Sequence, residues 1–583
     1  MRNIKDPSQR ELFDPLEHLP ASHRRDFLES PEGVFRAAIL EVLPAGELAE
    51  NFSEDTGRPT KELYSMAGLV LMMEYRNWTA KQAVNEYMWN GRVQLALNLS
   101  GYYPQLSERT LYRYMGLFQD NDCYLAQRAM EEVTGAVVER ADIDVSRQRL
   151  DSTHVFSDMA RFGRTRLMGV AVKRFLTQVI RHDRSAYEAL EESLRKRYEP
   201  SQGKLFGDTA KSKDAERYRL LRQQVAEDMH GLILNFEGHE RFKEAKTFKS
   251  LVRIFHEQCE LDGDKVQVRK KTGGRVMQNP SDGDATYDGH KGAGYQAQIC
   301  ETCGEANEVQ VITAVIPQTA VDADAASVKA VTDVLAGNGT LPDELDADAA
   351  YGSDANVQVC ERLGVELVSP TRANADLSAR EEDISASLTL DDFVIDEATE
   401  EVERCPAGHK PLCSVHDTAT GGTRTIMPAE VCRACDFAGE CPIQKTREGY
   451  RLTHTARDRR LAARRREEAT DVFRERYRKR AGIESTNSGI KRVTGLGRLR
   501  VRGRPRVFMA ILLKVSGWNI LRAAASARVR QYVLQKLDFG RIAGKIRLFP
   551  QNIHLTRITG ALLDCFHSKS DDIPRFSRKL LAA

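Results

Sequence analysis

Apolar side chains recur at helical spacing from Lys61 onward. They repeat at i, i+3, i+4, i+7 and i+8, which is typical of a helix with one buried face: Leu63, Met66, Ala67, Val70 and Leu71. A second helix is expected from Thr79, a favourable N-cap residue. A third is expected from Ser107, with Arg109 and Arg113 on its polar side. The pattern predicts a helical domain over residues 58–140, preceded by a polar segment, 1–57.

Strand patterns alternate with helical ones in the middle of the chain. An apolar stretch around Leu150 predicts a strand, and two further strands joined by a loop with Gly304 and Asn307 predict a hairpin. The remaining elements are expected to alternate between helix and strand. In order, the hairpin strands and these elements are strands 294–300 and 308–316, helix 320–336 closed by Gly337, strand 344–348, helix 354–363 and strand 364–369. This order predicts a mixed α/β sheet flanked by helices.

Two stretches interrupt this α/β pattern. Residues 170–260 predict long charged helices, over 187–198, 217–236 and 242–260, and therefore a helical insertion. Residues 371–465 are acidic at first and then rich in cysteine, which predicts a second insertion. The apolar run 507–521 predicts a last, buried helix. The expected domains are therefore an α/β core over 141–370 and 466–530, the two insertions, and a basic tail over 531–583.

Charge is distributed unevenly although the formal net charge of the 583 residues is only +2. Residues 445–506 hold 21 Lys/Arg and 7 Asp/Glu, whereas residues 371–404 hold 11 acidic and 3 basic residues. Opposed blocks of this kind favour a polyanion-binding region beside an acidic one. A solvated charged face is the alternative interpretation. The length predicts about three or four domains.

No sequence feature predicts a membrane segment. No apolar run reaches the roughly 18 residues that a spanning helix needs, and Lys514 interrupts the longest one. The first residues, Met-Arg-Asn-Ile-Lys-Asp, are charged and lack the apolar stretch of a signal peptide. We therefore expect a cytoplasmic protein.

Residues 477–491 place a carboxylate among cations. On a helix of about 3.6 residues per turn, five side chains share one stripe: Tyr477, Arg480, Glu484, Ser488 and Lys491. Gly482 and Gly489 each weaken a helix by roughly 1 kcal/mol relative to Ala, so packing must hold this one. A basic surface helix with a single Glu is the alternative.

These residues carry a resemblance to a known family. Tyr477, Arg480, Glu484 and Lys491 match Tyr-x2-Arg-x3-Glu-x6-Lys, which resembles the motif around the last carboxylate of DDE transposases from bacterial insertion sequences. Asp151-Ser-Thr resembles the first motif of that family. Asp348-Ala-Ala-Tyr351 resembles the second, Asp-x-Gly/Ala-Tyr/Phe, with Asp346 as the alternative carboxylate. Residues 59–115 also resemble, diffusely, the N-terminal helical domain of such transposases.

The resemblance implies a ribonuclease-H-like fold and two-metal chemistry. Asp151, Asp348 and Glu484 would be the catalytic carboxylates and would hold Mg²⁺ or Mn²⁺, which prefer oxygen ligands. Arg480 and Lys491 would contact DNA near the cleaved bond. Tyr477 would position DNA or pack. His154 is expected to be structural.

The implied function is transposition. The protein would bind terminal inverted repeats, free 3′-hydroxyls and join them to target DNA, as a homodimer near the bacterial nucleoid. Arg109 and Arg113, exposed on a helical domain, would add to DNA binding, although any small helical bundle would look similar. A metal-dependent nuclease, or a DNA-binding zinc protein without catalysis, are the alternatives.

Cysteines crowd into one segment. Of eleven in the chain, five lie in 405–441, which favours a metal site over a disulfide framework. We expect Cys405, Cys432, Cys435 and Cys441 to bind a structural Zn²⁺. Cys413, His409 or His416 could replace one of them, and reduced buried thiols are the alternative. Cys300 and Cys303 lack a second pair and predict no site.

Overall fold

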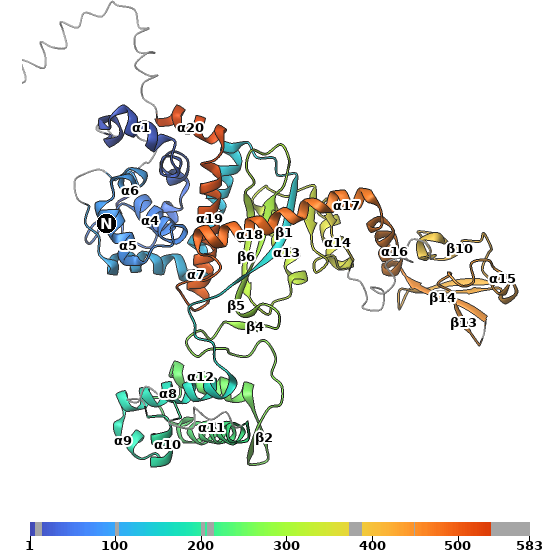
Figure 1. Cartoon of the computed structure of the whole chain (residues 1–583), viewed down its shortest axis with the longest axis horizontal. Coiled ribbons are helices and arrows are strands. Elements are labelled where there is room, and N and C mark those ends of the chain that lie inside the picture. Colours follow the sequence, from blue (N-terminus) through green and yellow to red (C-terminus); the bar gives the residue numbers. More distant parts are fainter. Residues whose placement is uncertain are drawn as a thin grey trace, which may run out of the picture.

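A central α/β body carries two smaller modules, one helical and one rich in β-strands (Figure 1). The computed structural model describes residues 1–5, 14–99, 104–199, 205–206, 215–371, 388–447 and 449–537. The expected basic tail therefore lies outside the described residues beyond Leu537, and so does part of the acidic stretch, 372–387.

Helices fill the first quarter of the chain. They are α1 (Ala21–Leu28), α2 (Pro31–Val34), α3 (Ala45–Ala49), α4 (Leu63–Tyr75), α5 (Ala80–Trp89), α6 (Gly91–Ala96) and α7 (Glu108–Ala141). Thr79 begins α5 with a capping box completed by Gln82, and Ser107 caps α7, as the sequence predicts. The third helix expected from Ser107 is present and ends at a kink over Asp120–Cys123, beyond which a second helical stretch extends α7 to Ala141. Short helices also form within 1–57, where the sequence predicted none.

The sheet has mixed strand directions. Its strands are β1 (Arg147–Val155), β4 (Thr286–Asp288), β5 (Gly292–Thr302), β6 (Ile312–Thr319), β7 (Glu344–Ala347) and β8 (Glu366–Val368). The order is β4-β5-β1-β7-β8, and β6 also pairs with β5. β1 runs antiparallel to β5 and parallel to β7, and β7 runs parallel to β8. The mixed α/β class and the hairpin predicted from the sequence are thus present.

Two helices follow the strands at positions close to those predicted. They are α13 (Val328–Gly337) and α14 (Asp354–Glu361). Gly337 is the last residue of α13, not the residue that follows its end. Asn338 is the C-cap, and Gly339 adopts the left-handed conformation with φ +66°. A glycine accepts that conformation without a Cβ clash, which explains the shift of the helix end by two residues.

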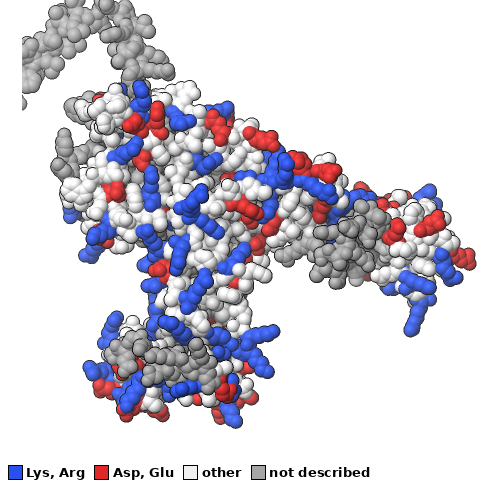
Figure 2. All heavy atoms as spheres, in the orientation of Figure 1, with Lys and Arg blue, Asp and Glu red and all other residues white. Residues whose placement is uncertain are grey.

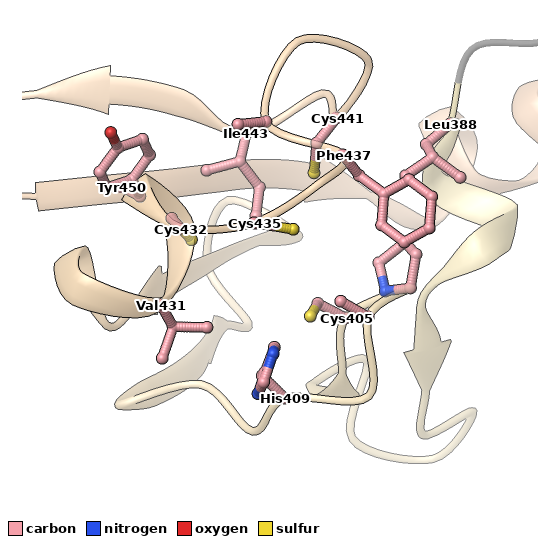
Figure 3. Close-up of a pocket in the computed structure, with 13 residues that line it drawn as sticks. Leu388, Cys405, His409, Val431, Cys432, Cys435, Phe437, Cys441, Ile443 and Tyr450 are labelled. Carbon is pink, nitrogen blue, oxygen red and sulfur yellow. The ribbon is translucent and has the colours of Figure 1, made fainter.

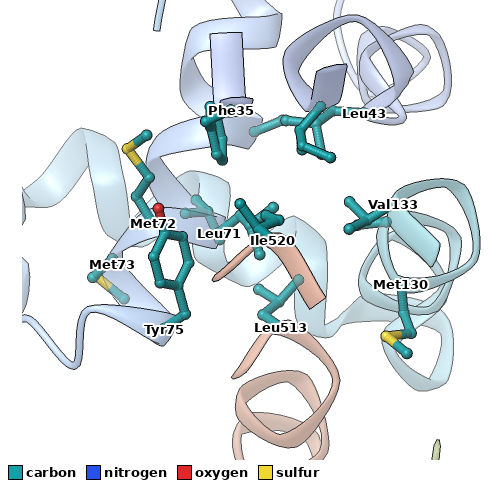
Figure 4. Packing of buried hydrophobic residues seen from close by; sticks show 14 of the residues in the cluster. Phe35, Leu43, Leu71, Met72, Met73, Tyr75, Met130, Val133, Leu513 and Ile520 are labelled. Atoms are coloured by element: carbon teal, nitrogen blue, oxygen red, sulfur yellow. The ribbon is translucent and has the colours of Figure 1, made fainter. Parts of the chain in front are cut away.

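Helix α19 (Arg504–Ala523) is the centre of the largest hydrophobic core. It packs against α4, α7 and β6, and α20 (Ala527–Leu537) continues the packing onto α7. Figure 4 shows Leu513 and Ile520 between side chains of α4 and α7. Gly517 allows the close approach, because a Cβ there would collide with the Tyr75 ring. The N-terminal helices and the sheet therefore share one core.

The helical module is the predicted insertion. It contains α8 (Arg164–His182), α9 (Arg184–Glu188), α10 (Glu192–Arg197), α11 (Ala215–Phe236), α12 (Lys246–Gln258) and the hairpin β2 (Cys259–Asp262) and β3 (Lys265–Val268). The single helix predicted over 187–198 is two short ones. The module has its own core, in which Phe175 contacts Phe236, Phe242 and Phe248.

The second module is built from short strands. These are β9 (Val394–Ile395), β10 (Val402–Arg404), β11 (Cys413–Asp417), β12 (Gly422–Met427), β13 (Gln444–Thr446) and β14 (Gly449–Thr455), with α15 (Ala429–Arg433) after β12. β11, β12, β14 and β13 form a four-stranded sheet in that order. α16 (Ala456–Glu468) leads back to the central body, towards α17 (Asp471–Arg478) and α18 (Gly482–Thr494).

Across the described ranges, no single helix is both long and apolar enough to cross a membrane; α19 and α20 meet that test only together, as a pair bent by 86°.

Lys514, the cation within the apolar helix α19, is buried and fully engaged. Its Nζ donates to the Glu74 carbonyl oxygen at 2.6 Å and to the Thr494 carbonyl oxygen at 2.8 Å, and lies 3.7 Å from the Glu74 carboxylate. Burial lowers the pKa of Lys514 and raises that of Glu74, while their mutual attraction opposes both shifts. One ammonium group thus joins the C-terminal ends of α4 and α18.

We predict that Lys514→Met lowers the free energy of unfolding by about 3–5 kcal/mol, because it leaves a buried carboxylate and two carbonyls unpaired. The thermal unfolding midpoint measures this. Lys329→Met is the matched control, since Lys329 is exposed on α13 and pairs only with Asp333, and it should cost less than about 0.5 kcal/mol. Equal midpoints for the two variants would contradict the prediction.

Candidate active site

Two of the predicted carboxylates meet at the edge of paired strands. In the parallel pairing of β1 with β7, Leu150 lies opposite Ala347. The residues that follow this pair are Asp151 on β1 and Asp348, directly after the end of β7. The Asp348 carboxylate accepts a hydrogen bond from the Ala350 amide at 2.8 Å, which fixes the turn after β7. Strand pairing alone therefore brings these carboxylates together from positions almost 200 residues apart in sequence.

Arg480 lies among all three predicted carboxylates. Its guanidinium nitrogens are 3.6 Å from Asp151, 3.8 Å from Asp348 and 3.8 Å from Glu484. The side chain of Glu484 is 71% exposed, whereas that of Asp151 is 15% exposed. Glu484 is therefore free to move relative to the two aspartates, which the sheet holds.

The helix that carries Arg480 and Glu484 is not continuous. The sequence predicted one helix through 477–491, but a 3₁₀ turn at Lys479–Ala481 separates α17 from α18. Arg149 on β1 donates to the Lys479 carbonyl oxygen at 3.1 Å within this turn. The backbone of Arg478, Lys479, Ala481 and Gly482 keeps right-handed helical angles through this turn, and Arg480 stays 3.8 Å from Glu484.

The predicted glycine positions in α18 are points of close packing. A Cβ on Gly482 would collide with the Arg149 guanidinium, which is held by an ion pair with buried Glu301 at 2.6 Å. A Cβ on Gly489 would lie 2.8 Å from the Trp518 ring of α19. The helix is thus held by packing, as the sequence argument required.

Burial and charge act against each other at Asp151. Burial raises the pKa of its carboxyl group, and the Arg480 guanidinium lowers it. The Asn487 amide also donates to Asp151, at 3.3 Å. Burial is the larger effect, so the pKa of Asp151 is raised overall, and the neighbouring Asp348 and Asp324 carboxylates add to this shift.

Lys491 and Tyr477 lie at the same site. Burial lowers the pKa of Lys491, and the Asp151 carboxylate opposes this shift. Tyr477 stacks on Phe473 with ring centroids 5.9 Å apart, and burial raises its pKa. Both Arg480 and the two aspartates are close enough to act on its hydroxyl. Tyr477 therefore packs against Phe473 and also lies close to the carboxylates.

Sequence reasoning missed Lys291. Its Nζ donates to the Ser152 hydroxyl at 2.9 Å and to Gln296 at 3.3 Å, and lies 3.5 Å from Asp324. It is close enough to Lys491 to lower the pKa of that side chain. Lys291 precedes β5 in a glycine-containing turn, where neither periodicity nor a motif marks it.

His154 and Asp346 have the surroundings of structural residues. Burial lowers the pKa of His154 to about 4, and its ring packs edge-on against Phe156. Asp346 is fully buried, pairs with Arg147 at 3.4 Å, and has a pKa raised to about 6 by burial. Asp346 makes no ion pair with Arg480, so the geometry favours Asp348 as the second carboxylate.

Basic side chains surround the site and continue onto the neighbouring surface. Six arginines are exposed from the end of α18, through the connecting segment, to the start of α19: Arg492, Arg498, Arg500, Arg502, Arg504 and Arg506. Figure 2 shows Lys and Arg side chains spread from the region of α18 over the β4–β5 end of the sheet towards the helical module. This surface suits a polyanion.

Arg109 and Arg113 lie apart from the carboxylates, at the start of α7. Both are exposed, and the Arg113 guanidinium lies over the Phe52 ring, 5.0 Å from its centroid. Together with Arg58 and Lys61 they line a pocket of about 880 Å³. The predicted cations thus share one basic pocket.

The four predicted zinc ligands converge in the second module. Cys405, Cys432, Cys435 and Cys441 line one small cavity with His409, and the close-up in Figure 3 shows their thiols turned into it. Cys413 is exposed on β11 and His416 bonds to Thr423, so neither lines the cavity. As the side chains stand, no group of three or more His, Cys, Asp or Glu residues in the described parts of the chain is arranged to hold a metal ion.

Comparison with known proteins gives one match. A family model described as the transposase DDE domain matches residues 404–524. No curated protein and no solved structure matches the chain. The matched segment contains the five cysteines of the second module together with Arg480, Glu484 and Lys491. It ends one residue after α19. The match supports a transposase-type enzyme of the DDE class, a class that generally uses divalent metal ions.

We predict that Gly489→Ala destabilises the protein by about 1–3 kcal/mol, because the added methyl group overpacks the contact with Trp518. The matched control is Gly135→Ala in α7, where a Cβ meets nothing within 4 Å. That change should stabilise by up to about 1 kcal/mol through helix propensity. The thermal unfolding midpoints of both variants measure these effects. Midpoints that shift in the same direction would contradict the close packing of Gly489 against Trp518.

Proposed function

We propose that this protein is a DDE transposase of the bacterial insertion-sequence type, with a ribonuclease-H-like catalytic core. The observation that carries the proposal is the meeting of Asp151, Asp348 and Glu484 around Arg480. The order of strand, hairpin, helix, strand, helix and strand in the sheet supports the proposed core, and so does the family match at residues 404–524. The core comprises 141–370 and 466–530, with the helical domain of 58–140 beside it.

The carboxylates suit a pair of hard cations. Asp151, Asp348 and Glu484 offer only oxygen ligands, which Mg²⁺ and Mn²⁺ prefer. Two such ions, when bound, activate the attacking oxygen and stabilise the leaving oxygen of the phosphodiester. Exposed Glu484 would complete the ligand set by turning towards the two aspartates. Arg480, released from the carboxylates, would then be free to bind a DNA phosphate.

The reaction we propose is cleavage at the ends of the element and transfer to target DNA. The exposed arginines between α18 and α19, with Lys491 and Lys291, would hold the phosphates near the site. Arg109 and Arg113 would contact the terminal inverted repeats from the helical domain. The synaptic complex would be a homodimer on DNA in the bacterial cytoplasm. The five cysteines of the second module have no part in this chemistry.

Two other functions share parts of this site. A stand-alone metal-dependent nuclease would cleave DNA at the same carboxylates without joining the ends. A DNA-binding zinc protein derived from a transposase would do neither. Incubation of the protein with Mg²⁺, a DNA fragment ending in the inverted repeats that flank its gene, and a supercoiled target separates the three. Joined products support the transposase, cleavage alone supports the nuclease, and bound but intact DNA supports the third.

We expect Asp151→Ala, Asp348→Ala and Glu484→Ala each to abolish Mg²⁺-dependent cleavage while leaving DNA binding nearly unchanged, because a carboxylate holds metal and repels phosphate. Asp333→Ala on α13 is the control, since it is an exposed carboxylate paired with Lys329. Asp346→Asn tests the alternative ligand. If Asp348→Ala cleaved normally and Asp346→Asn did not, the second ligand would be Asp346.

We expect Arg480→Gln and Lys491→Gln to slow cleavage within the bound complex more than they weaken binding, because both side chains lie beside Asp151. Single-turnover cleavage and equilibrium binding measure the two effects separately. Arg502→Gln, outside the carboxylate cluster, should instead weaken binding and reduce the log–log salt slope by about 0.9 per lost duplex phosphate contact. If the Arg480→Gln variant cleaved DNA at the normal rate once bound, the proposed contact between Arg480 and the cleaved phosphate would be wrong.

A further inference from the structure

The cysteines of the second module come from two separate segments of the chain. Cys405 follows β10, whereas Cys432, Cys435 and Cys441 lie between β12 and β13. Folding brings them around one cavity of about 30 Å³ (Figure 3). A cavity of this size holds little more than a water molecule or an ion. The fold therefore creates this group of four thiols, because Cys405 is far in sequence from the other three and reaches them only through tertiary structure.

Tight turns present the thiols. After Cys405, the Gly408 amide donates to the Cys405 carbonyl oxygen at 2.8 Å, and the Cys405 amide donates to the His409 carbonyl oxygen at 3.0 Å. Gly408 has φ +81°, which a non-glycine residue rarely adopts. A second turn follows Cys435, where the Ala438 amide donates to the Cys435 carbonyl oxygen at 3.1 Å. The two turns hold their cysteines towards each other across the cavity.

The apolar core of the second module is too small to stabilise its fold by packing alone. Its buried cluster consists of Phe393, Val402, Cys405, Met427 and Leu452. Cys432 and Cys441 pack against this cluster only partly buried. Small domains with so few buried side chains ordinarily depend on a disulfide or a metal. The ten cysteines in the described part of the chain are all free, so no disulfide serves that purpose there.

We propose that Cys405, Cys432, Cys435 and Cys441 bind one structural Zn²⁺ in the cavity between these turns. Zn²⁺ takes four thiolates in a tetrahedron at about 2.3 Å. The four sulfurs border the cavity but are not yet arranged around a common point, and each can be moved by rotation about its Cα–Cβ bond. A site with four thiolates has no open position, and its role is therefore to hold the fold.

Two groups near the four cysteines are not expected to be zinc ligands. His409 borders the cavity but belongs to the turn after Cys405, and we assign it no zinc bond. Cys413 is exposed on β11, outside the cavity. Binding at this site stabilises the module directly, since the free energy of zinc binding adds to that of folding. It is independent of the carboxylates and of any DNA chemistry.

The test is the metal content of the full-length protein, purified without chelator and measured by elemental analysis. We expect about one Zn²⁺ per chain, and less than about a tenth of that in Cys432→Ser and Cys435→Ser. Cys413→Ser is the matched control and should retain the metal, as should His409→Gln. Full zinc in the Cys432→Ser/Cys435→Ser double variant, or no zinc in the unchanged protein, would overturn the proposal. Iron with labile sulfide in place of zinc would overturn it too.

A spectroscopic measurement on the unchanged protein tests the site without relying on the folding of the cysteine variants. Co²⁺ exchanged into the unchanged protein should give the strong visible bands of a tetrahedral site and a thiolate charge-transfer band. Weak octahedral bands would refute the assigned ligand set. Limited proteolysis gives the structural readout, because removal of the metal should expose new cleavage sites between about 400 and 445. Cleavage that is identical with and without chelator would show that no metal holds the module.

Discussion

The candidate site depends on the register between β1 and β7. A shift of one residue would turn either Asp151 or Asp348 to the other face of the sheet. Gln148, fully buried on β1, fixes this register from both sides. Its amide donates to the Thr340 carbonyl oxygen at 2.6 Å, just before β7, and its side-chain oxygen accepts from Thr313 on β6. Leaving those groups unpaired in the core would cost more than the pairing itself gains, which excludes neighbouring registers.

The third carboxylate is positioned by a different set of contacts. Asn519 on α19 pairs with both backbone groups of Ile312 at the start of β6, at 2.9 and 2.7 Å, and also donates to Thr134 of α7. Lys514, one turn and a half earlier on the same helix, binds the end of α18. Helix α19 thus connects the N-terminal helices, the sheet and the helix of Glu484. A DNA segment held by α7 and a phosphate held at the carboxylates would therefore lie on one body.

The sequence predicted individual helices, strands and candidate site residues better than the tertiary contacts between them. Caps such as Thr79 and Ser107 act through near neighbours, so their effect was visible in sequence. The kink in α7, the 3₁₀ turn at 479–481 and the split of helix 187–198 depend on tertiary contacts, among them the bond from Arg149 to Lys479. Lys291 and the role of Gln148 were missed for the same reason. Their partners lie from 5 to 192 residues away, at distances that no periodic pattern records.

Electrostatics explains why a basic surface surrounds an acidic site. Three carboxylates at one place repel each other and repel DNA, and in a partly buried site each such interaction is of the order of several kcal/mol. Arg480 offsets one of the three charges at close range, and Lys491 and Lys291 lie on the Asp151 side. The row of arginines after α18 lies further out, where salt screens it over about 10 Å. Cations close to the carboxylates therefore set the local charge, and the outer ones attract the polyanion.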